Sequence, residues 1–278
     1  MSEPTVVAAR AGEVIGDAPD RRVEILGDHE ALHATWSRFG PRRDGADPHV
    51  HRRHTDVFYV LAGELTIRLG REDEAVVAPA GTLARVPPMV VHGFRNGTDD
   101  EVRYLNFHVP GTGFADYMRA LRDGRTPVFD QEPPPAAGVN PASEAVVGGA
   151  EVLAGGPGPR VVLLADMPEV VIAEMSATGD TPATPEHVHE RHAESFYALG
   201  GDLVVTVDGR ALRLEPGSWL TVPPGVTHAV AVAGSGAARF LNLHAPGCGF
   251  GAFLRAVHAG DALDAAIVRA GFDERRAA

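Results

Sequence analysis

Short apolar segments interrupted by Gly, Pro and Asp make up most of the hydrophobic pattern of the chain. Residues 57–61 and 65–69 are two such segments. In the second half, residues 202–207 run into Asp208-Gly209 and continue as residues 210–214. An Asp-Gly pair between two apolar runs is a strong signal for a two-residue β-hairpin. Short strands bounded by turn residues are typical of antiparallel sheets, so the pattern predicts an all-β protein.

A few segments depart from this pattern. Residues 114–121 and 250–257 carry apolar residues at spacings of three and four, which predicts a helix in each. A further helix is expected from Asp261, a candidate N-cap, through Val268. Residues 127–141 are rich in Pro and have few patterned apolar positions, which predicts an extended linker.

The whole pattern occurs twice. Matching residues lie 138 positions apart up to Gly63 and Gly201, and 136 positions apart from Gly81 and Gly217 onward. Shortening a hairpin turn by two residues keeps every later side chain on its original face, and the turn around residues 70–74 is the expected place. We therefore predict two domains, residues 1–125 and 148–278, joined by a linker at residues 126–147.

Composition and charge narrow the function. The 278 residues carry 25 basic and 37 acidic side chains, a net charge of −12. That balance repels phosphate backbones and anionic lipids, so we expect a small-molecule substrate rather than nucleic acid or a membrane. A single cysteine, Cys248, excludes an intrachain disulfide, and its counterpart Thr112 speaks against a nucleophilic role. The first residues do not resemble a signal peptide, and the default expectation is the cytoplasm.

Four polar residues of the second half form a candidate metal site. His187 and His189 are two residues apart, so on a strand their imidazoles share a face. Glu194 follows His189 by five residues, an odd number, and a turn must intervene before it can face the same way. His228 follows the rigid Pro223-Pro224-Gly225. Together these residues offer three nitrogens and one carboxylate oxygen.

The same arrangement recurs in the first half. A lone histidine usually packs or lies at the surface, but chance packing gives no reason to repeat both the pair and the distant third histidine. Such a ligand set leaves coordination positions open and suits Fe(II), Mn(II), Ni(II), Co(II) or Cu(II), with zinc less favoured. We expect one divalent ion per half, with the second site the better matched. The candidate ligands are His187, His189, Glu194 and His228, and in the first half His49, His51, Asp56 and His92.

These residues carry a resemblance to a known family. The pattern His187-x-His189-x4-Glu194-x6-Gly201, followed by Gly217-x5-Pro223-x-Gly225-x2-His228, resembles the two signature motifs of the cupin superfamily. With its first-half copy the resemblance covers nearly the whole chain apart from the linker and the two termini. It implies a bicupin: two tandem β-barrels of the double-stranded β-helix (jelly-roll) type, each with a metal site at its mouth. It also implies a homodimer.

The first half departs from the motif at two places. Asp56 stands where the motif has Glu, and because it is one methylene shorter its carboxylate is expected to reach a ligand histidine or a water instead of the ion. Three histidines alone can still hold a divalent ion. Met89 stands where the motif has Gly. His54 and His192 also recur, and we expect them to be exposed turn residues near the mouth, with a role in supporting the ligands or the substrate as the alternative.

Among bicupins, the chain is most similar to the quercetin dioxygenase-like group. The resemblance implies dioxygenation of a small enolisable or phenolic substrate, with dioxygen as a second substrate and Glu194 as the base that takes the hydroxyl proton. Two other classes stay open. One is a metal-dependent isomerase or decarboxylase of a small keto or carboxylate compound. The other is a non-catalytic small-molecule or metal-binding protein, because one fold hosts many functions.

Overall fold

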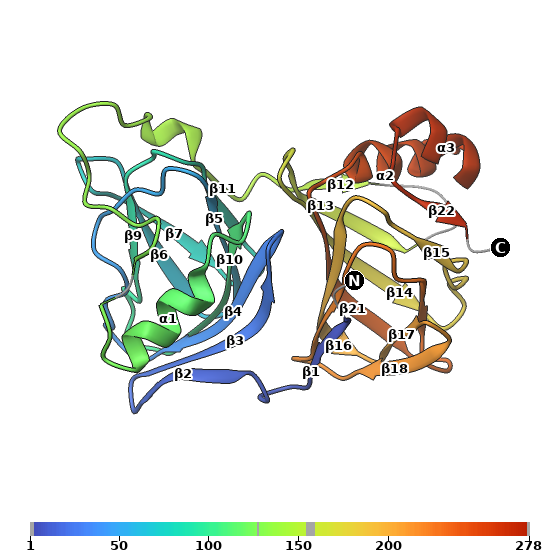
Figure 1. Cartoon of the computed structure of the whole chain (residues 1–278), viewed down its shortest axis with the longest axis horizontal. Helices are drawn as coiled ribbons and strands as arrows, with labels where there is room; N and C mark the ends of the chain where they lie inside the picture. The colour runs from blue at the N-terminus through green and yellow to red at the C-terminus, as the bar shows by residue number, and fades with distance from the viewer. Residues whose placement is uncertain (1–2, 127, 154–158, 277–278) are drawn as a thin grey trace. The chain divides into compact units, whose positions relative to one another are not determined.

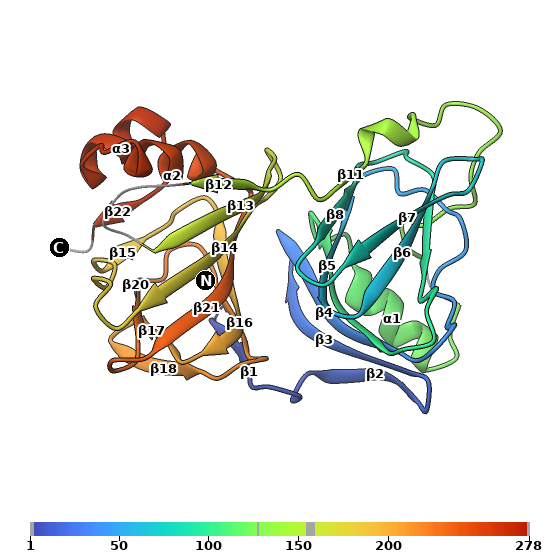
Figure 2. The same ribbon diagram turned by 180° about the vertical axis from the view of Figure 1, so that it is seen from behind.

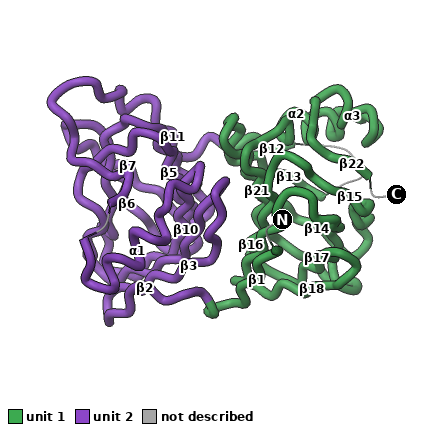
Figure 3. Tube along the Cα trace, viewed as in Figure 1, with its two compact units in different colours: residues 1–11, 150–278 green, residues 12–149 purple. Residues whose placement is uncertain are grey.

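The computed structural model describes residues 3–126, 128–153 and 159–276. These residues form two compact units, which Figure 3 distinguishes by colour. The N-terminal unit comprises residues 12–149. The C-terminal unit comprises residues 150–278 together with residues 1–11. The predicted linker at residues 126–147 therefore lies within the N-terminal unit.

The N-terminal unit is a jelly roll of two antiparallel sheets (Figure 1). The larger sheet has the order β11-β8-β5-β10-β4-β3-β2 and the smaller one β7-β6-β9. The elements are β2 (Glu13–Ala18), β3 (Arg21–His29), β4 (Leu32–Phe39), β5 (Thr55–Ala62), β6 (Glu64–Leu69), β7 (Glu74–Pro79), β8 (Leu83–Val86), β9 (His92–Arg95), β10 (Val102–Val109), α1 (Phe114–Arg122), the short 3-10 helix η1 (Ala142–Glu144) and β11 (Val146–Val147).

The C-terminal unit repeats this architecture (Figure 2). Its sheets have the orders β1-β19-β16-β21-β14-β13-β12 and β18-β17-β20-β15-β22. The elements are β1 (Thr5–Val7), β12 (Glu151–Leu153), β13 (Arg160–Asp166), β14 (Val171–Thr178), β15 (His187–Val188), β16 (Ala193–Gly201), β17 (Leu203–Val207), β18 (Arg210–Leu214), β19 (Trp219–Val222), β20 (His228–Val232), β21 (Ala237–Ala245), α2 (Phe250–His258), α3 (Leu263–Ala270) and β22 (Arg275–Arg276).

The all-β prediction and the repeat are confirmed, although the sheets do not close into continuous barrels. The two-residue difference lies where the sequence predicted it. Leu69 pairs with Glu74 across a four-residue turn, whereas Val207 pairs with Arg210 across Asp208-Gly209. Asp208 and Gly209 both have positive φ, 46° and 76°, which is the geometry of the type I′ turn that matches strand twist.

The three predicted helices are present. α1 and α2 begin at Phe114 and Phe250, as expected, and end one residue beyond the predicted limits. α3 begins at Leu263 and its N-cap is Ala262, so the prediction of Asp261 as N-cap is wrong. The Asp261 carboxylate instead accepts a hydrogen bond from Arg269 at 2.6 Å. None of the described helices combines the length and apolar character needed to cross a membrane.

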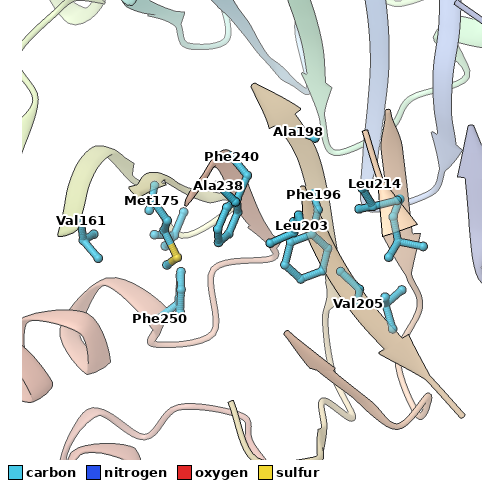
Figure 4. Packing of buried hydrophobic residues seen from close by; sticks show 14 of the residues in the cluster. Val161, Met175, Phe196, Ala198, Leu203, Val205, Leu214, Ala238, Phe240 and Phe250 are labelled. Carbon is cyan, nitrogen blue, oxygen red and sulfur yellow. The ribbon is translucent and has the colours of Figure 1, made fainter. Parts of the chain in front are cut away.

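Each unit has its own apolar core between its two sheets. In the C-terminal unit the core gathers side chains from both sheets and from α2, among them Met175, Phe240 and Phe250 (Figure 4). Alternate residues of β16 face this core, because side chains along a strand point to opposite faces. Glu194 and Phe196 therefore share one face, and Glu194 lies near the beginning of β16.

Candidate metal centres

Four side chains from neighbouring strands converge in the C-terminal unit. His187 on β15 pairs with His228 on β20, which places the two imidazoles next to each other. His189 follows β15, and a bend at residues 190–191 leads into β16, which carries Glu194. This bend is the turn that the odd spacing between His189 and Glu194 required. All four residues are buried.

Their spacing suits one ion. Glu194 Oε2 lies 2.6 Å from His228 Nε2, 3.0 Å from His189 Nε2 and 3.8 Å from His187 Nε2. Two ligands that are each about 2.1 Å from one ion, at right angles to each other, are about 3 Å apart. The four ligand atoms all lie within 4.8 Å of one another, so a single divalent ion can contact all of them.

A backbone carbonyl orients each imidazole of this group. The Nδ1 atoms of the three histidines donate to the backbone oxygens of Pro185, Asp273 and Val226, in the order His187, His189, His228. A carbonyl oxygen only accepts, so Nδ1 carries the hydrogen and Nε2 of the neutral ring presents a lone pair to the group. Three lone pairs and a carboxylate that face one point repel each other without a cation. The chemistry of this donor set therefore fits a divalent metal.

The N-terminal unit places His49, His51, Asp56 and His92 in the same way. His49 and His92 form an antiparallel bridge with backbone hydrogen bonds of 2.8 and 2.9 Å. The Nε2 atoms of His49 and His51 are 3.2 Å apart. Backbone oxygens of Asp47, Asp130 and Val90 accept from the Nδ1 atoms of His49, His51 and His92. This group also lies within 4.8 Å and is buried.

The shorter acid changes the geometry of this group. Asp56 Oδ2 lies 3.4 Å from His92 Nε2 and 3.6 Å from His51 Nε2, whereas Glu194 approaches the equivalent atoms to 2.6 and 3.0 Å. The Asp56 carboxylate thus sits farther from its histidines, in line with its missing methylene.

The pKa of one histidine also differs between the two groups. Burial and the neighbouring histidines lower the pKa of His49 to about 3, with only a weak opposing attraction from Asp56. Burial also lowers the pKa of His187, but the nearby Glu194 carboxylate, together with Glu274 and the backbone oxygen of Pro185, raises it by more, so that the pKa is raised overall. Burial alone would raise the pKa of Glu194, yet the surrounding histidines, first among them His244, hold it well below its usual range. Glu194 is therefore ionised at neutral pH.

A hydrogen-bonded chain continues from Glu194 away from the ligand histidines. Asn242 Nδ2 donates to Glu194 Oε1 at 2.7 Å, and Asn242 Oδ1 lies 3.1 Å from His244 Nε2. His244 Nδ1 is 2.8 Å from His192 Nε2, and His192 Nδ1 donates to Asp273 Oδ2 at 3.2 Å. This network holds one oxygen of Glu194, so that the other faces the histidines. Supporting contacts of this kind orient metal ligands in proteins.

The N-terminal unit repeats the network with Asp56, Asn106, His108, His54 and Asp130. The sequence did not identify Asp130 or Asp273 in advance. A signal was present, because the same dipeptide, Phe-Asp, follows the helix of each half at residues 129–130 and 272–273. The two dipeptides are 143 residues apart and so fall outside the 136- and 138-residue offsets.

The expectation that His54 and His192 are exposed turn residues is wrong. Each is only 1% exposed. His54 connects Asp130 to His108, and His192 connects Asp273 to His244. Burial lowers the pKa of His54 to about 4 and lowers that of His192 as well. The acceptor that makes this burial tolerable comes from a segment about 80 residues away, which local sequence pattern does not reveal.

An apolar cavity of about 410 Å³ adjoins the C-terminal group. Glu194, His187 and His189 form its polar end, and Phe196, Phe240 and Met175 are among the apolar side chains of its wall. Residues of α2, including Leu254, and residues 261–263 at the start of α3 also line the cavity. Among the described residues that line it, none is Arg, and the acidic ones are Glu194, Asp261 and Glu274.

The single cysteine lies outside both four-residue groups. Cys248 is half-buried, and burial raises the pKa of its thiol. It lies near His192 and Asp273, but both of these residues are already engaged with each other. That Cys248 is not a nucleophile stays a prediction.

Comparison with known proteins gives the following relatives. The family described as Cupin domain matches residues 35–108 and 174–244. Quercetin 2,3-dioxygenase of Bacillus subtilis (strain 168) is 25% identical over 229 residues, which span 68% of this chain and 66%, just under two thirds, of that protein.

Two solved structures are similar in fold. Oxalate decarboxylase from Bacillus subtilis, solved at pH 4.6, has a TM-score of 0.57 at 16% identity, covering 86% of this chain and 75% of the other. The protein Ylba from E. coli has a TM-score of 0.62 at 12% identity, covering 87% and 90%. At these identities the likeness concerns the fold alone.

Proposed function

This chain belongs to the cupin family, and we propose that it is a metal-dependent dioxygenase whose C-terminal unit acts on a small, uncharged substrate with an enol or phenol group. The observation that carries the proposal is the cavity of about 410 Å³, which brings apolar walls together with three members of the four-residue group, His187, His189 and Glu194. Cavities of this size with mostly apolar walls and a few convergent polar groups are typical of small-molecule sites. The relationship to a quercetin dioxygenase supports the same reaction class.

The charge of the cavity wall favours an uncharged substrate. A dicarboxylate such as oxalate, on which one of the structural neighbours acts by name, is best held by Arg or Lys in addition to a metal. The chain has no Lys, and none of the described lining residues is Arg. Asp261 and Glu274 in the lining would repel an anion. A ring compound with a hydroxyl group suits this cavity better.

In this proposal His187, His189, His228 and Glu194 hold one divalent transition ion, of iron, manganese, nickel, cobalt or copper. A bound ion of this kind supplies a Lewis acid with open coordination positions. Glu194 is ionised and lines the cavity, so its carboxylate takes the proton of the substrate hydroxyl. Asn242 holds the other carboxylate oxygen at 2.7 Å and so fixes the direction in which Glu194 accepts the proton. The apolar walls exclude water from the site.

The N-terminal group is proposed to hold a second ion through His49, His51 and His92. Its three Nε2 atoms are oriented by backbone oxygens as in the C-terminal group. Asp56 stays farther away and is held by Asn106. We assign this ion no step in the reaction.

Two measurements test the proposal. Elemental analysis of protein purified without a metal-chelating tag should find a transition metal at one to two ions per chain. Oxygen-electrode assays with flavonols and β-diketones should then show oxygen uptake that depends on the substrate. A metal-loaded protein without such uptake would contradict the dioxygenase. Turnover of a substrate under anaerobic conditions would favour an isomerase or decarboxylase, and tight binding without any turnover would favour a binding protein.

A further inference from the structure

The two units differ inside, at positions that the strand registers make equivalent. In the N-terminal unit, Phe39, Phe58, Phe94 and Tyr104 pack against one another. Ring centroids are 5.1 Å apart for Phe58 and Phe94, 5.4 Å for Phe39 and Tyr104, and 6.0 Å for Phe39 and Phe94. These distances are those of aromatic pairs in direct contact. Four rings therefore fill the space between the sheets beyond Asp56.

The C-terminal unit has only two of these four rings. Phe196 and Phe240 take the places of Phe58 and Tyr104, with centroids 6.2 Å apart. Ala177 takes the place of Phe39, and Val230 takes the place of Phe94. The strand registers establish this equivalence. Phe39 pairs with Val102 as Ala177 pairs with Ala238. Phe94 pairs with Ile67 as Val230 pairs with Val205, and all these matches keep the repeat offsets.

The space left by the two missing rings belongs to the cavity. Ala177, Phe196, Val230 and Phe240 are all lining residues of the 410 Å³ cavity. In the N-terminal unit the backbone of Gly45 lies directly against the ring of Phe94, because a Cβ atom at Gly45 would be only 2.3 Å from that ring. The backbone therefore blocks movement of the ring toward Gly45.

We propose that the residues at positions 177 and 230 decide which unit admits an organic ligand. Ala177 and Val230 open the C-terminal unit to one neutral ring compound per chain, and Phe39 and Phe94 exclude such a ligand from the N-terminal unit. The N-terminal group then serves as a metal centre without a substrate pocket. This inference deepens the proposed function by naming the ligand class and the residues that select for it, but it concerns binding and not turnover.

The test restores the missing rings. Ala177→Phe/Val230→Phe should fill the cavity in the way that Phe39 and Phe94 do in the other unit. Metal-loaded wild type is titrated with 2-naphthol by calorimetry, and we expect one binding site per chain. The double variant should show no binding and keep its full metal content. Ala229→Phe, on the same strand as Val230 but outside the cavity lining, is the matched control and should bind as wild type does.

Several results would overturn the proposal. They are retention of one site by the double variant, two sites per chain in wild type, and no binding by wild type. If the double variant fails to fold, the single Val230→Phe variant replaces it, and binding weakened less than tenfold would then contradict the proposal. Failure of the proposed dioxygenase function would give a different result. Wild type would still bind 2-naphthol at one site and Val230→Phe would remove that site, but no substrate would support oxygen uptake.

Discussion

The two units have the same metal-ligand framework and different surroundings. In both, three histidines are oriented by backbone carbonyls, and an Asn–His–His–Asp chain supports the acid. The C-terminal unit combines Glu194 with an open apolar cavity, whereas the N-terminal unit combines Asp56 with four packed aromatic rings. The two copies share this framework and differ in the acid and in the space beside it. The parts that bind an ion and the parts that admit a substrate are therefore separable.

Replacing the two acids should give the largest contrast. Glu194→Gln removes the proposed base but keeps the shape of the side chain, and we expect kcat for oxygen uptake with a flavonol to fall by about 100-fold or more. Asp56→Asn should leave kcat within about twofold. Elemental analysis separates loss of the base from loss of the ion. Equal losses from the two substitutions would show that the units are not functionally distinct, and full activity of Glu194→Gln would remove the base assignment.

Acidification should affect the metal-depleted N-terminal unit first. Burial lowers the pKa of His54 to about 4, so below about pH 6.5 the unfolded chain binds a proton that the folded unit does not. Stability is then present above pH 6.5 and is lost as the pH falls toward 4, by up to about 3 kcal/mol for this one group. His49, with its pKa at about 3, acts in the same direction. In the C-terminal unit the lowered pKa values of His192 and His244 act in the same direction as that of His54, and only the raised pKa of His187 has the opposite sign. The expected difference between the units therefore rests on His49 compared with His187.

Each unit contains one tryptophan, Trp36 or Trp219, which makes this contrast measurable. The fluorescence of Trp219→Phe reports on the N-terminal unit and that of Trp36→Phe on the C-terminal unit. Denaturation between pH 7 and 4 should show the larger loss in the N-terminal unit. If the C-terminal unit unfolded at a higher pH than the N-terminal unit during acidification, the expected order of stability loss would be wrong.

Removing the carboxylate that supports the C-terminal group should have a smaller effect, on metal affinity. Asp273 accepts from the backbone nitrogens of residues 190 and 191 and from His192, and so holds the bend between His189 and Glu194. Asp273→Ala should weaken the C-terminal site by about tenfold, as loss of such support usually does. Competition with a chelator measures the affinity of each site. Asp264→Ala, a highly exposed side chain on α3, is the control. A uniform loss at both sites would mean that the change acts on stability and not on the ligands.

The smallest predicted effect concerns the turn before the third histidine. Met89 and Gly225 are equivalent and both adopt positive φ, 64° and 83°, while their backbone nitrogens donate to the carbonyls of His51 and His189. A residue with a Cβ costs about 1 kcal/mol in this region. Gly225→Ala should therefore lower the free energy of unfolding of the C-terminal unit by about that amount. Met89→Gly should change the other unit less, because relief of strain is offset by a more flexible unfolded chain.

The strands and the two four-residue groups follow from local pattern, and this is why the sequence predicted where they lie. Apolar segments, the Asp208-Gly209 turn and the helical spacings each depend on neighbouring residues only. Because each histidine of the pattern occurs in both halves, the repeat strengthened the prediction of a metal site. The N-cap of α3 was wrong because Asp261 has its partner, Arg269, on the outer surface of the helix. His54 and His192 were wrong because their burial depends on Asp130 and Asp273, which arrive from distant segments.

By itself the sequence determined two all-β repeats, the four candidate ligands in each, and the shorter acid in the first. These features have a period, a spacing or a side-chain length that can be counted along the chain. Only the tertiary structure decided that the C-terminal unit is hollow and the N-terminal unit is filled. Whether an interior is open depends on how side chains from several strands meet. Ala177 and Val230 are ordinary apolar residues until the register sets them opposite Phe196 and Phe240.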